Sequence, residues 1–269
     1  MSLHVLGAPL AGLVGAVPAA DGGGYQAPTT QEFYQPLIGD GPFAITRAAV
    51  VILLSVALIG YVLVRTTRRA AIVPSRGQWM TESVYGLVRN GVARDIIGSH
   101  DFMRFVPMLF SMFVLILVNN LFGVIPPVQF PTMSRIGFPI ALTLIVYVVY
   151  HYLGIKKNGF VGYFKGLVPE GVSGPGAIPL FILELVSNVM RLLSLSVRLF
   201  ANILAGHLII LFMSGGLAVL LGLEALGVFT LPAGVALFLF ELGLVATLQA
   251  FIFATLSAIY IGGAVAEHH

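Results

Sequence analysis

The sequence predicts an all-α polytopic membrane protein with about five membrane helices and one amphipathic helix at the membrane surface. Three observations lead to this prediction. Hydrophobic residues make up 58% of the 269 residues. Charged residues make up only 9%, against about 25% in soluble domains. The mean hydropathy of +0.99 comes from long apolar runs, as a hydrocarbon core of about 30 Å requires.

The N-terminal segment differs from the rest of the chain. It mixes small apolar residues with several prolines and the stretch DGGGYQAP, which predicts a mostly extended tail. A signal sequence around Leu6–Val17 is the alternative, although no basic region precedes that apolar run. We therefore divide the chain into an extracytoplasmic tail, residues 1–42, and a membrane domain, residues 43–269.

Three apolar runs in the first part of the membrane domain each suit one crossing. They cover Ala44–Val64, Phe105–Ile125 and Gly137–Ile155. Between the first two, residues 75–104 carry apolar side chains at helical spacing and charged ones on the remainder. This pattern predicts an amphipathic helix lying on the membrane surface. Its apolar positions are Trp79, Met80, Val84, Leu87, Val88 and Ile96.

The last two apolar runs are longer. Ile178–Met213 holds about 36 residues, roughly 54 Å as a helix, and Leu231–Gly262 about 32 residues, roughly 48 Å. Both lengths exceed the hydrocarbon core of about 30 Å, so we expect these helices to be strongly tilted or nearly horizontal. A Gly-rich turn region containing Glu224 separates them.

The basic residues predict the orientation. They cluster in residues 65–104 and 156–165, whereas the loop after the second run holds only Arg135. The positive-inside rule then places the N-terminus outside and the C-terminus inside, with five crossings. Six crossings are the alternative, if residues 214–230 re-enter the membrane.

The composition argues against several kinds of site. The chain has no cysteine, which rules out disulfides, iron–sulfur clusters and thiolate zinc sites. Its six histidines form no metal-ligand spacing such as HExxH, and no phosphate-binding loop or dinucleotide fingerprint is present. We therefore expect no metal, no cofactor and no nucleic acid partner.

A polar stripe runs along the fourth apolar run. Glu184, Arg191 and Arg198 are seven residues apart, so they drift by only about 20° per step around a helix. His207 comes out about half a turn from Arg198, on a second polar surface. The stripe also includes Ser187, Asn188, Ser194 and Asn202.

Arg198 lies near the middle of this run, where an arginine costs about 2.5–3.5 kcal/mol. Its neighbours three and four residues away carry no carboxylate, so an anionic partner would come from another helix or another protein. A structural arginine paired with a helix neighbour is the alternative. For Arg191 we expect a snorkelling or salt-bridged structural role, because Glu184 lies two turns away.

Glu241 and Gln249 are the embedded polar residues of the fifth run. A lone glutamate in apolar surroundings calls for a partner, and His207 is the natural candidate. Carboxyl and imidazole groups can exchange protons near neutral pH, whereas a guanidinium stays charged. We therefore expect His207 and Glu241 to conduct protons and Arg198 to hold a charge. Gln249 could equally form a helix-packing hydrogen bond.

Two asparagines, Asn119 and Asn120, stand near the outer end of the second run. They could line an aqueous inlet from outside, or they could hydrogen-bond a neighbouring helix. The sequence favours neither interpretation.

Five stretches resemble subunit a of the F-type ATP synthase, especially its actinobacterial forms. They are SLSVRLFANILAGH (194–207), TLQAFIF (247–253), ESVYGLVRNG (82–91), LVNNLFGVIP (117–126) and the C-terminal IYIGG. The resemblance covers most of residues 80–263, with its signature region in 178–263. It implies that residues 43–269 form a proton-channel domain, a stator beside a rotating ring whose subunits each carry one carboxylate.

The resemblance also assigns residues. The family's arginine falls on Arg198, its asparagine on Asn202 and its glutamine on Gln249. The acid and imidazole pair of its last two helices falls on His207 and Glu241. One departure is that the second member usually stands seven residues before the glutamine, whereas Glu241 stands eight before it. A local bulge in the helix would restore the geometry; otherwise Glu241 has a slightly different part.

The mechanism that the resemblance implies has two half-channels that do not meet. Protons enter from outside and neutralise a ring carboxylate after passing Asn119, Asn120, Glu241, His207 and Gln249. After nearly a full turn of the ring they leave on the inner side past Glu184, Ser187, Asn188 and Ser194. Arg198 lies between the two paths and prevents a short circuit.

The implied partners are the c-ring, the peripheral-stalk b subunits, the rest of the ATP synthase and membrane lipid. The chain is expected to be a channel component without catalysis of its own, in a bacterial plasma membrane or, alternatively, the mitochondrial inner membrane. A secondary transporter with Arg198 binding an anionic substrate is the rival function, but the sequence shows no convincing inverted repeats. An intramembrane hydrolase with His207 as base lacks a paired nucleophile.

Overall fold

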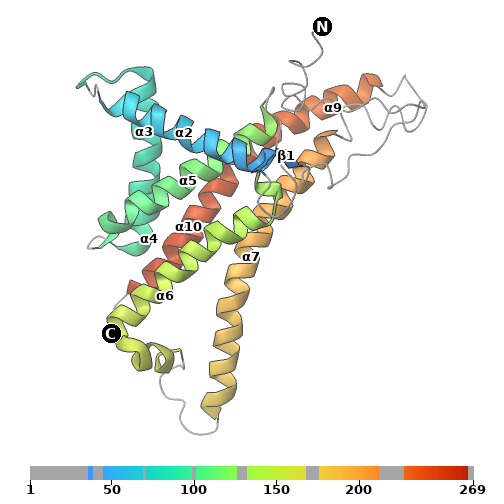
Figure 1. Cartoon of the computed structure of the whole chain (residues 1–269). Coiled ribbons are helices and arrows are strands. Elements are labelled where there is room, and N and C mark those ends of the chain that lie inside the picture. The colour runs from blue at the N-terminus through green and yellow to red at the C-terminus, as the bar shows by residue number, and fades with distance from the viewer. Residues whose placement is uncertain are drawn as a thin grey trace. The chain divides into compact units, whose positions relative to one another are not determined.

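Helices make up nearly all of the chain that the computed structural model describes, namely residues 36–38, 45–68, 71–98, 101–125, 132–167, 176–211 and 227–265 (Figure 1). Five helices in this part are long and apolar enough to cross a membrane, which confirms the predicted fold class. A short antiparallel pair, β1 (Pro36–Ile38) and β2 (Ile45–Thr46), is an addition that the sequence did not predict.

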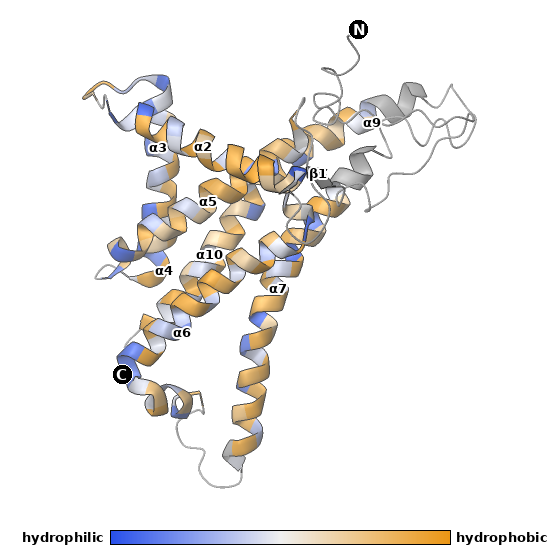
Figure 2. Cartoon of the chain, in the orientation of Figure 1, coloured by the Kyte–Doolittle hydropathy of each residue, from blue (hydrophilic) through white to orange (hydrophobic). Residues whose placement is uncertain are grey.

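The spanning helices fall where the apolar runs predicted them, within a few residues at most ends. They are α2 (Arg47–Thr67), α5 (Phe102–Val124), α6 (Gly137–Lys165), α7 (Ala177–Leu211) and a last span made of α9 (Gly227–Phe240), the π-helix η7 (Glu241–Val245) and α10 (Ala246–Val265). Figure 2 shows these helices apolar over most of their length. Their tilt stays a prediction.

The third span has its predicted end at Ile155, whereas α6 ends ten residues later at Lys165 and its backbone leaves the helical conformation at Gly159. Lysine is a good helix former and can extend its charged end to water, so Lys156 and Lys157 do not stop the helix. The turn comes instead at Gly159, whose φ of 70° is left-handed and is readily adopted by glycine. The following turn packs Tyr163 against Gly154, where a larger residue would collide with the tyrosine ring.

The predicted amphipathic helix forms as α3 (Arg76–Gly86), η2 (Leu87–Arg94) and α4 (Asp95–Ile97). One face of its second half is buried, with Val88 and Val92 fully covered, whereas Leu87 is 44% exposed. Trp79 and Met80, which belong to the apolar positions of the predicted surface helix, are 61% and 62% exposed. Tyr85 packs edge-on against Phe110 of α5, with ring centroids 5.5 Å apart. The helix therefore has packing contacts in both halves, through Tyr85 of α3 and through the buried residues of η2.

Several predictions lie outside the described residues. They concern the signal sequence around Leu6–Val17, most of the N-terminal tail, and Glu224 in the region between the last two runs. The six-crossing alternative belongs here too, because residues 212–226 are among those not described. These points stay predictions.

The contacts group the chain into two compact units. The first holds Met1–Val62, Leu115–Arg135 and Phe200–Gln249. The second holds Leu63–Val114, Ile136–Leu199 and Ala250–His269.

Within the second unit, α6 and α10 lie side by side. The Tyr150 and Tyr260 rings are 6.0 Å apart between centroids, and Lys157 Nζ donates to the Val265 carbonyl at 2.7 Å. Gly262 of α10 faces the backbone of Ile96, where an added Cβ would stand 3.2 Å from the carbonyl oxygen. This unit therefore has a closely packed frame for the first part of α7.

Candidate functional site

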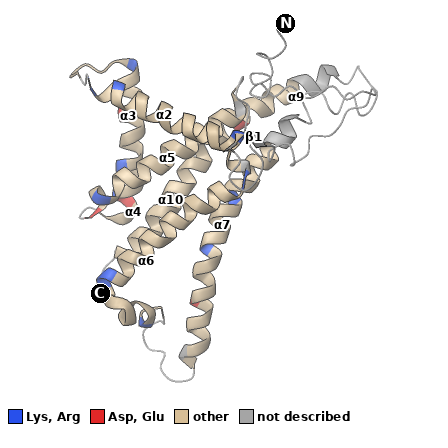
Figure 3. Ribbon diagram, viewed as in Figure 1, with Lys and Arg blue, Asp and Glu red and all other residues tan. Residues whose placement is uncertain are grey.

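Arg198 stands on the uncovered side of α7. Its own side chain and that of Val197 are exposed, whereas Leu195 and Leu199 are buried. Among the residues that the structure describes, none forms a hydrogen bond or ion pair with its guanidinium. The alternative of an arginine paired with a helix neighbour therefore finds no support in this part of the chain. Figure 3 shows the charged residues spaced along α7.

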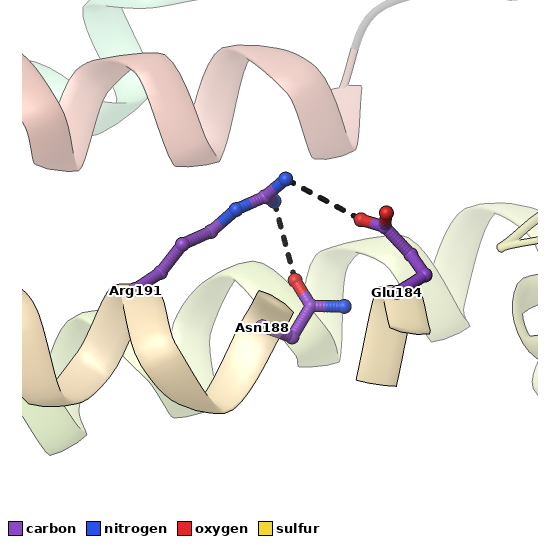
Figure 4. A network of polar contacts seen from close by, with 3 residues as sticks. All are labelled: Glu184, Asn188 and Arg191. Atoms are coloured by element: carbon purple, nitrogen blue, oxygen red, sulfur yellow. Dashed lines mark hydrogen bonds and ion pairs between the residues drawn. The ribbon is translucent and has the colours of Figure 1, made fainter. Parts of the chain in front are cut away.

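Arg191, by contrast, is held by its own helix (Figure 4). Its Nη2 lies 3.3 Å from Glu184 Oε1, and its Nη1 donates to Asn188 Oδ1 at 3.2 Å. The guanidinium carbon lies 5.9 Å from the centre of the Tyr260 ring of α10. The salt bridge predicted for Arg191 is confirmed.

These groups line a cavity of about 540 Å³ within the second unit. It lies where the end of α6, the first part of α7 and the end of α10 meet. Its polar and aromatic lining residues are Tyr150, Asn158, Tyr163, Glu184, Asn188, Arg191 and Tyr260. Ser187 and Ser194, also predicted for the inner path, are not among the lining residues; Ser187 is partly exposed and Ser194 exposed. The cavity therefore unites two of the four predicted inner residues.

In the first unit, Gln249 meets Asn202. The Asn202 amide nitrogen donates to Gln249 Oε1 at 3.1 Å, and Gln249 is 4% exposed. The structure thus joins two residues that lie 47 positions apart and were singled out separately. This bond ties the last span to α7.

Glu241 packs directly on α7. It is 8% exposed, and its carboxylate lies so close to Gly206 that an added Cβ would stand 2.6 Å from the carboxyl carbon. Only glycine leaves room for the carboxylate there. The next residue of α7 is His207, whose side chain lies outside the described part. The pairing of Glu241 with His207 therefore stays a prediction, although the two positions adjoin.

The eight-residue spacing of Glu241 and Gln249 is explained by η7. The π-helix spans Glu241–Val245, and the Ala246 amide donates to the Glu241 carbonyl. A π turn is wider than an α turn and takes up an extra residue. Glu241 and Gln249 consequently meet Gly206 and Asn202, which stand four apart on one face of α7. The bulge that the offset called for is present.

The two asparagines of α5 are both buried and hydrogen-bonded. Asn119 donates to Ser55 Oγ at 2.9 Å and to the Leu115 carbonyl at 2.8 Å, and it accepts from Thr132 at 2.8 Å. Asn120 donates to the Ala246 carbonyl at 3.2 Å, directly after η7. The contacts of Asn119 are those of a helix-packing residue. Asn120 Oδ1 is buried and has no partner among the described atoms.

Sequence reasoning missed several residues of these sites. Gly206 belongs to the stretch that resembles the family, but no role was assigned to it. Ser55 is a lone serine in an apolar run, and such a residue indicates a polar contact between helices. The cavity tyrosines gave no signal, because single tyrosines in membrane helices are common near interfaces. Among the described residues, no group of three or more histidine or acidic side chains is placed to hold a metal ion.

Comparison with known proteins gives a consistent family. The family described as ATP synthase A chain matches residues 48–262. Proteins named ATP synthase subunit a are similar over nearly the whole chain. One from a Nocardioides species is 41% identical over 94% of this chain and 98% of its own length, and one from Pseudarthrobacter chlorophenolicus has the same values. One from Frankia alni is 36% identical over 93% of this chain and 90% of its own.

Proposed function

We propose a residue-level proton path for this chain, which belongs to the ATP synthase subunit a family. As a member of that family it is a multi-pass membrane protein and the proton-translocating stator subunit of a rotary ATP synthase. The path has three parts, one for each group of polar residues described above.

Arg198 is the charge that faces the ring carboxylates. The observation that carries this assignment is an exposed arginine on a membrane helix with no partner in the described structure. Such a charge is costly in a membrane unless an anion meets it. A carboxylate on a passing subunit would supply that anion and would be held in its ionised form.

The same charge separates the two half-channels. A fixed guanidinium does not release its proton, and it repels a proton that approaches along the helix. Each charge that crosses 100 mV represents about 2.3 kcal/mol, so a direct leak would dissipate the energy available for ATP synthesis. Arg198 therefore prevents direct proton transfer between the half-channels, so that protons cross only on the ring carboxylates.

The outer path uses the buried set of the first unit. Glu241 and His207 take up and release protons, and Gln249 with Asn202 guides them toward the ring. The support is the contact of Glu241 with Gly206, which brings a carboxylate next to the position of His207. Asn120 borders this path at Ala246, and Asn119 fixes the helices around it.

The inner path uses the cavity of the second unit. Glu184 and Asn188 line it, and Ser187 and Ser194 belong to the same stretch of α7. The cavity adjoins Asn158, one residue beyond the Lys156–Lys157 pair, which the positive-inside rule places on the inner side. A proton that leaves the ring would reach the inner water there.

The assembly follows from these assignments. The c-ring contacts the exposed side of α7, and the peripheral-stalk b subunits and other subunits complete the complex. We place the chain in a bacterial plasma membrane, with residues 43–269 as the channel domain, the N-terminus outside and the C-terminus inside. It performs no catalysis alone.

The test is ATP-driven acidification of inverted vesicles that carry the assembled synthase with Arg198→Ala. We expect acidification to fall to background while ATP synthase subunits remain assembled. Arg104→Ala is the matched control, since Arg104 is also an exposed arginine of a spanning helix but is remote in sequence from the stripe. Acidification at the wild-type rate in the Arg198→Ala complex would overturn the central assignment.

A further inference from the structure

The Arg191 guanidinium is fixed by three groups that all line the inner cavity. Glu184 and Asn188 hold its two terminal nitrogens at 3.3 and 3.2 Å, and the Tyr260 ring lies 5.9 Å away. A cation within about 6 Å of an aromatic face is attracted to it. The guanidinium therefore has a defined place in the cavity wall.

The bond between Arg191 and Glu184 spans an unusual distance along the helix. Side chains that pair on a helix are normally three or four residues apart, but these two are seven apart. Helical side chains lean toward the N-terminus, and Figure 4 shows Arg191 reaching back along α7 in this way. Asn188 stands between them and holds the arginine in its extended position.

The cavity offers one carboxylate that can accept and release a proton. Glu184 and Arg191 are the only charged residues among those that line it, and arginine does not deprotonate. The Tyr150 hydroxyl is buried without a partner among the described atoms, so the cavity is polar as well as large enough for water.

We propose that Arg191 is a positioning residue of the inner proton path. It holds the Glu184 carboxylate at the cavity and balances its charge. Glu184 then accepts a proton from a ring carboxylic acid and gives it to cavity water, which restores the carboxylate. This inference rests on the proposed function and adds to it the residue that positions the Glu184 carboxylate for proton transfer.

The charge balance gives the proposal its direction. With both residues present the cavity wall is neutral. Without Arg191 it carries an uncompensated negative charge that retains protons, and the carboxylate loses its fixed place. Without Glu184 it carries a positive charge that repels protons and has no acceptor. Removal of Arg191 should therefore lower conduction only while Glu184 is present.

The experiment measures passive proton conduction in inverted vesicles after removal of the catalytic sector, normalised to the amount of assembled subunit. We expect Arg191→Gln to lower conduction by about three- to fivefold, in keeping with the modest strength of a partly exposed ion pair. Arg191→Lys should recover most of the loss, because it keeps the charge. Lys156→Gln removes a charge from an exposed residue that does not line the cavity and should conduct normally.

The decisive comparison uses the Glu184→Gln background. If Arg191 acts through Glu184, adding Arg191→Gln to Glu184→Gln causes no further loss. An equal loss in both backgrounds would show that Arg191 acts on its own and would overturn the proposal. Normal conduction by Arg191→Gln alone, or by Glu184→Gln alone, would overturn it as well.

These outcomes are distinct from failure of the proposed function. The proposed function is tested by Arg198→Ala, and the result of that substitution does not involve the cavity. If the Arg191→Gln complex does not assemble, Asn188→Ala serves instead, since it removes the bridge while leaving both charges. We expect about a twofold loss that disappears in the Glu184→Gln background, and persistence of the loss there would count against the proposal.

Discussion

The polar residues that meet α7 differ sharply in packing between the two units. In the first unit, Glu241 and Gln249 are 8% and 4% exposed and touch Gly206 and Asn202 directly. In the second, the side chains of Glu184 and Arg191 are 33% and 43% exposed and border a cavity of about 540 Å³. One set is closely packed, and the other is open.

The two sets of residues meet different physical requirements of a proton path. Buried groups exchange protons only when their atoms are placed within hydrogen-bonding reach, so the first set should be sensitive to volume and helix register. Groups beside a cavity can use water as an intermediate, so the second set should be sensitive to charge. Substitutions that change one property at a time can test this division.

Among the single substitutions that test this comparison, Gly206→Ala should give the largest effect. The added methyl group would overlap the Glu241 carboxylate, and a displacement of about 1 Å at a reacting group can cost 100-fold in rate. We expect ATP-driven acidification to fall by at least about tenfold. Gly243→Ala is the matched control, since nothing lies within 4 Å of the Cβ position at Gly243. Normal acidification by Gly206→Ala would show that the buried set tolerates volume and would remove the contrast.

A change of helix register sharpens the same comparison. Deletion of Gly243 from η7 should let the π turn close into a regular α-helix, which leaves Glu241 and the glutamine seven residues apart on one face. Acidification should remain within about threefold of wild type, since the two groups keep their partners. Insertion of one alanine after Gly243 rotates them apart by about 100° and should abolish acidification. Equal effects of deletion and insertion would show that the π-helix has no part in placing Glu241.

Much of the fold could be predicted from the sequence, because membrane spans depend on local composition. Each apolar run of the expected length became a helix, and the positions of Glu184 and Arg191 on one stripe predicted their ion pair. The end of α6 could not be predicted in this way. It depends on the left-handed conformation of Gly159 and on Tyr163 packing over Gly154, and both are tertiary features.

The candidate site was predictable in its residues and less so in its contacts. The apolar surroundings of Glu241 and the resemblance pointed to this residue, but the role of Gly206 becomes visible only when a carboxylate from another helix packs on it. A local bulge was one of two explanations for the one-residue offset before Gln249, and η7 is that bulge. The cavity had no sequence signal, since it forms from α6, α7 and α10 together.

Asn119→Leu should give the smallest effect on transport and tests whether every buried polar residue of the first unit belongs to the path. Within the described part of the chain, the hydrogen bonds of Asn119 go to Ser55, Leu115 and Thr132, so it has little capacity left for water. Its loss removes the acceptor of the Thr132 hydroxyl and should cost about 1–3 kcal/mol of stability, seen as faster thermal inactivation of the complex. Acidification per assembled complex should stay within about twofold of wild type, as for an exposed control, Ser111→Ala. Unchanged thermal inactivation with lost acidification would instead place Asn119 on the inlet, and the close packing of the first unit would then include a route for water.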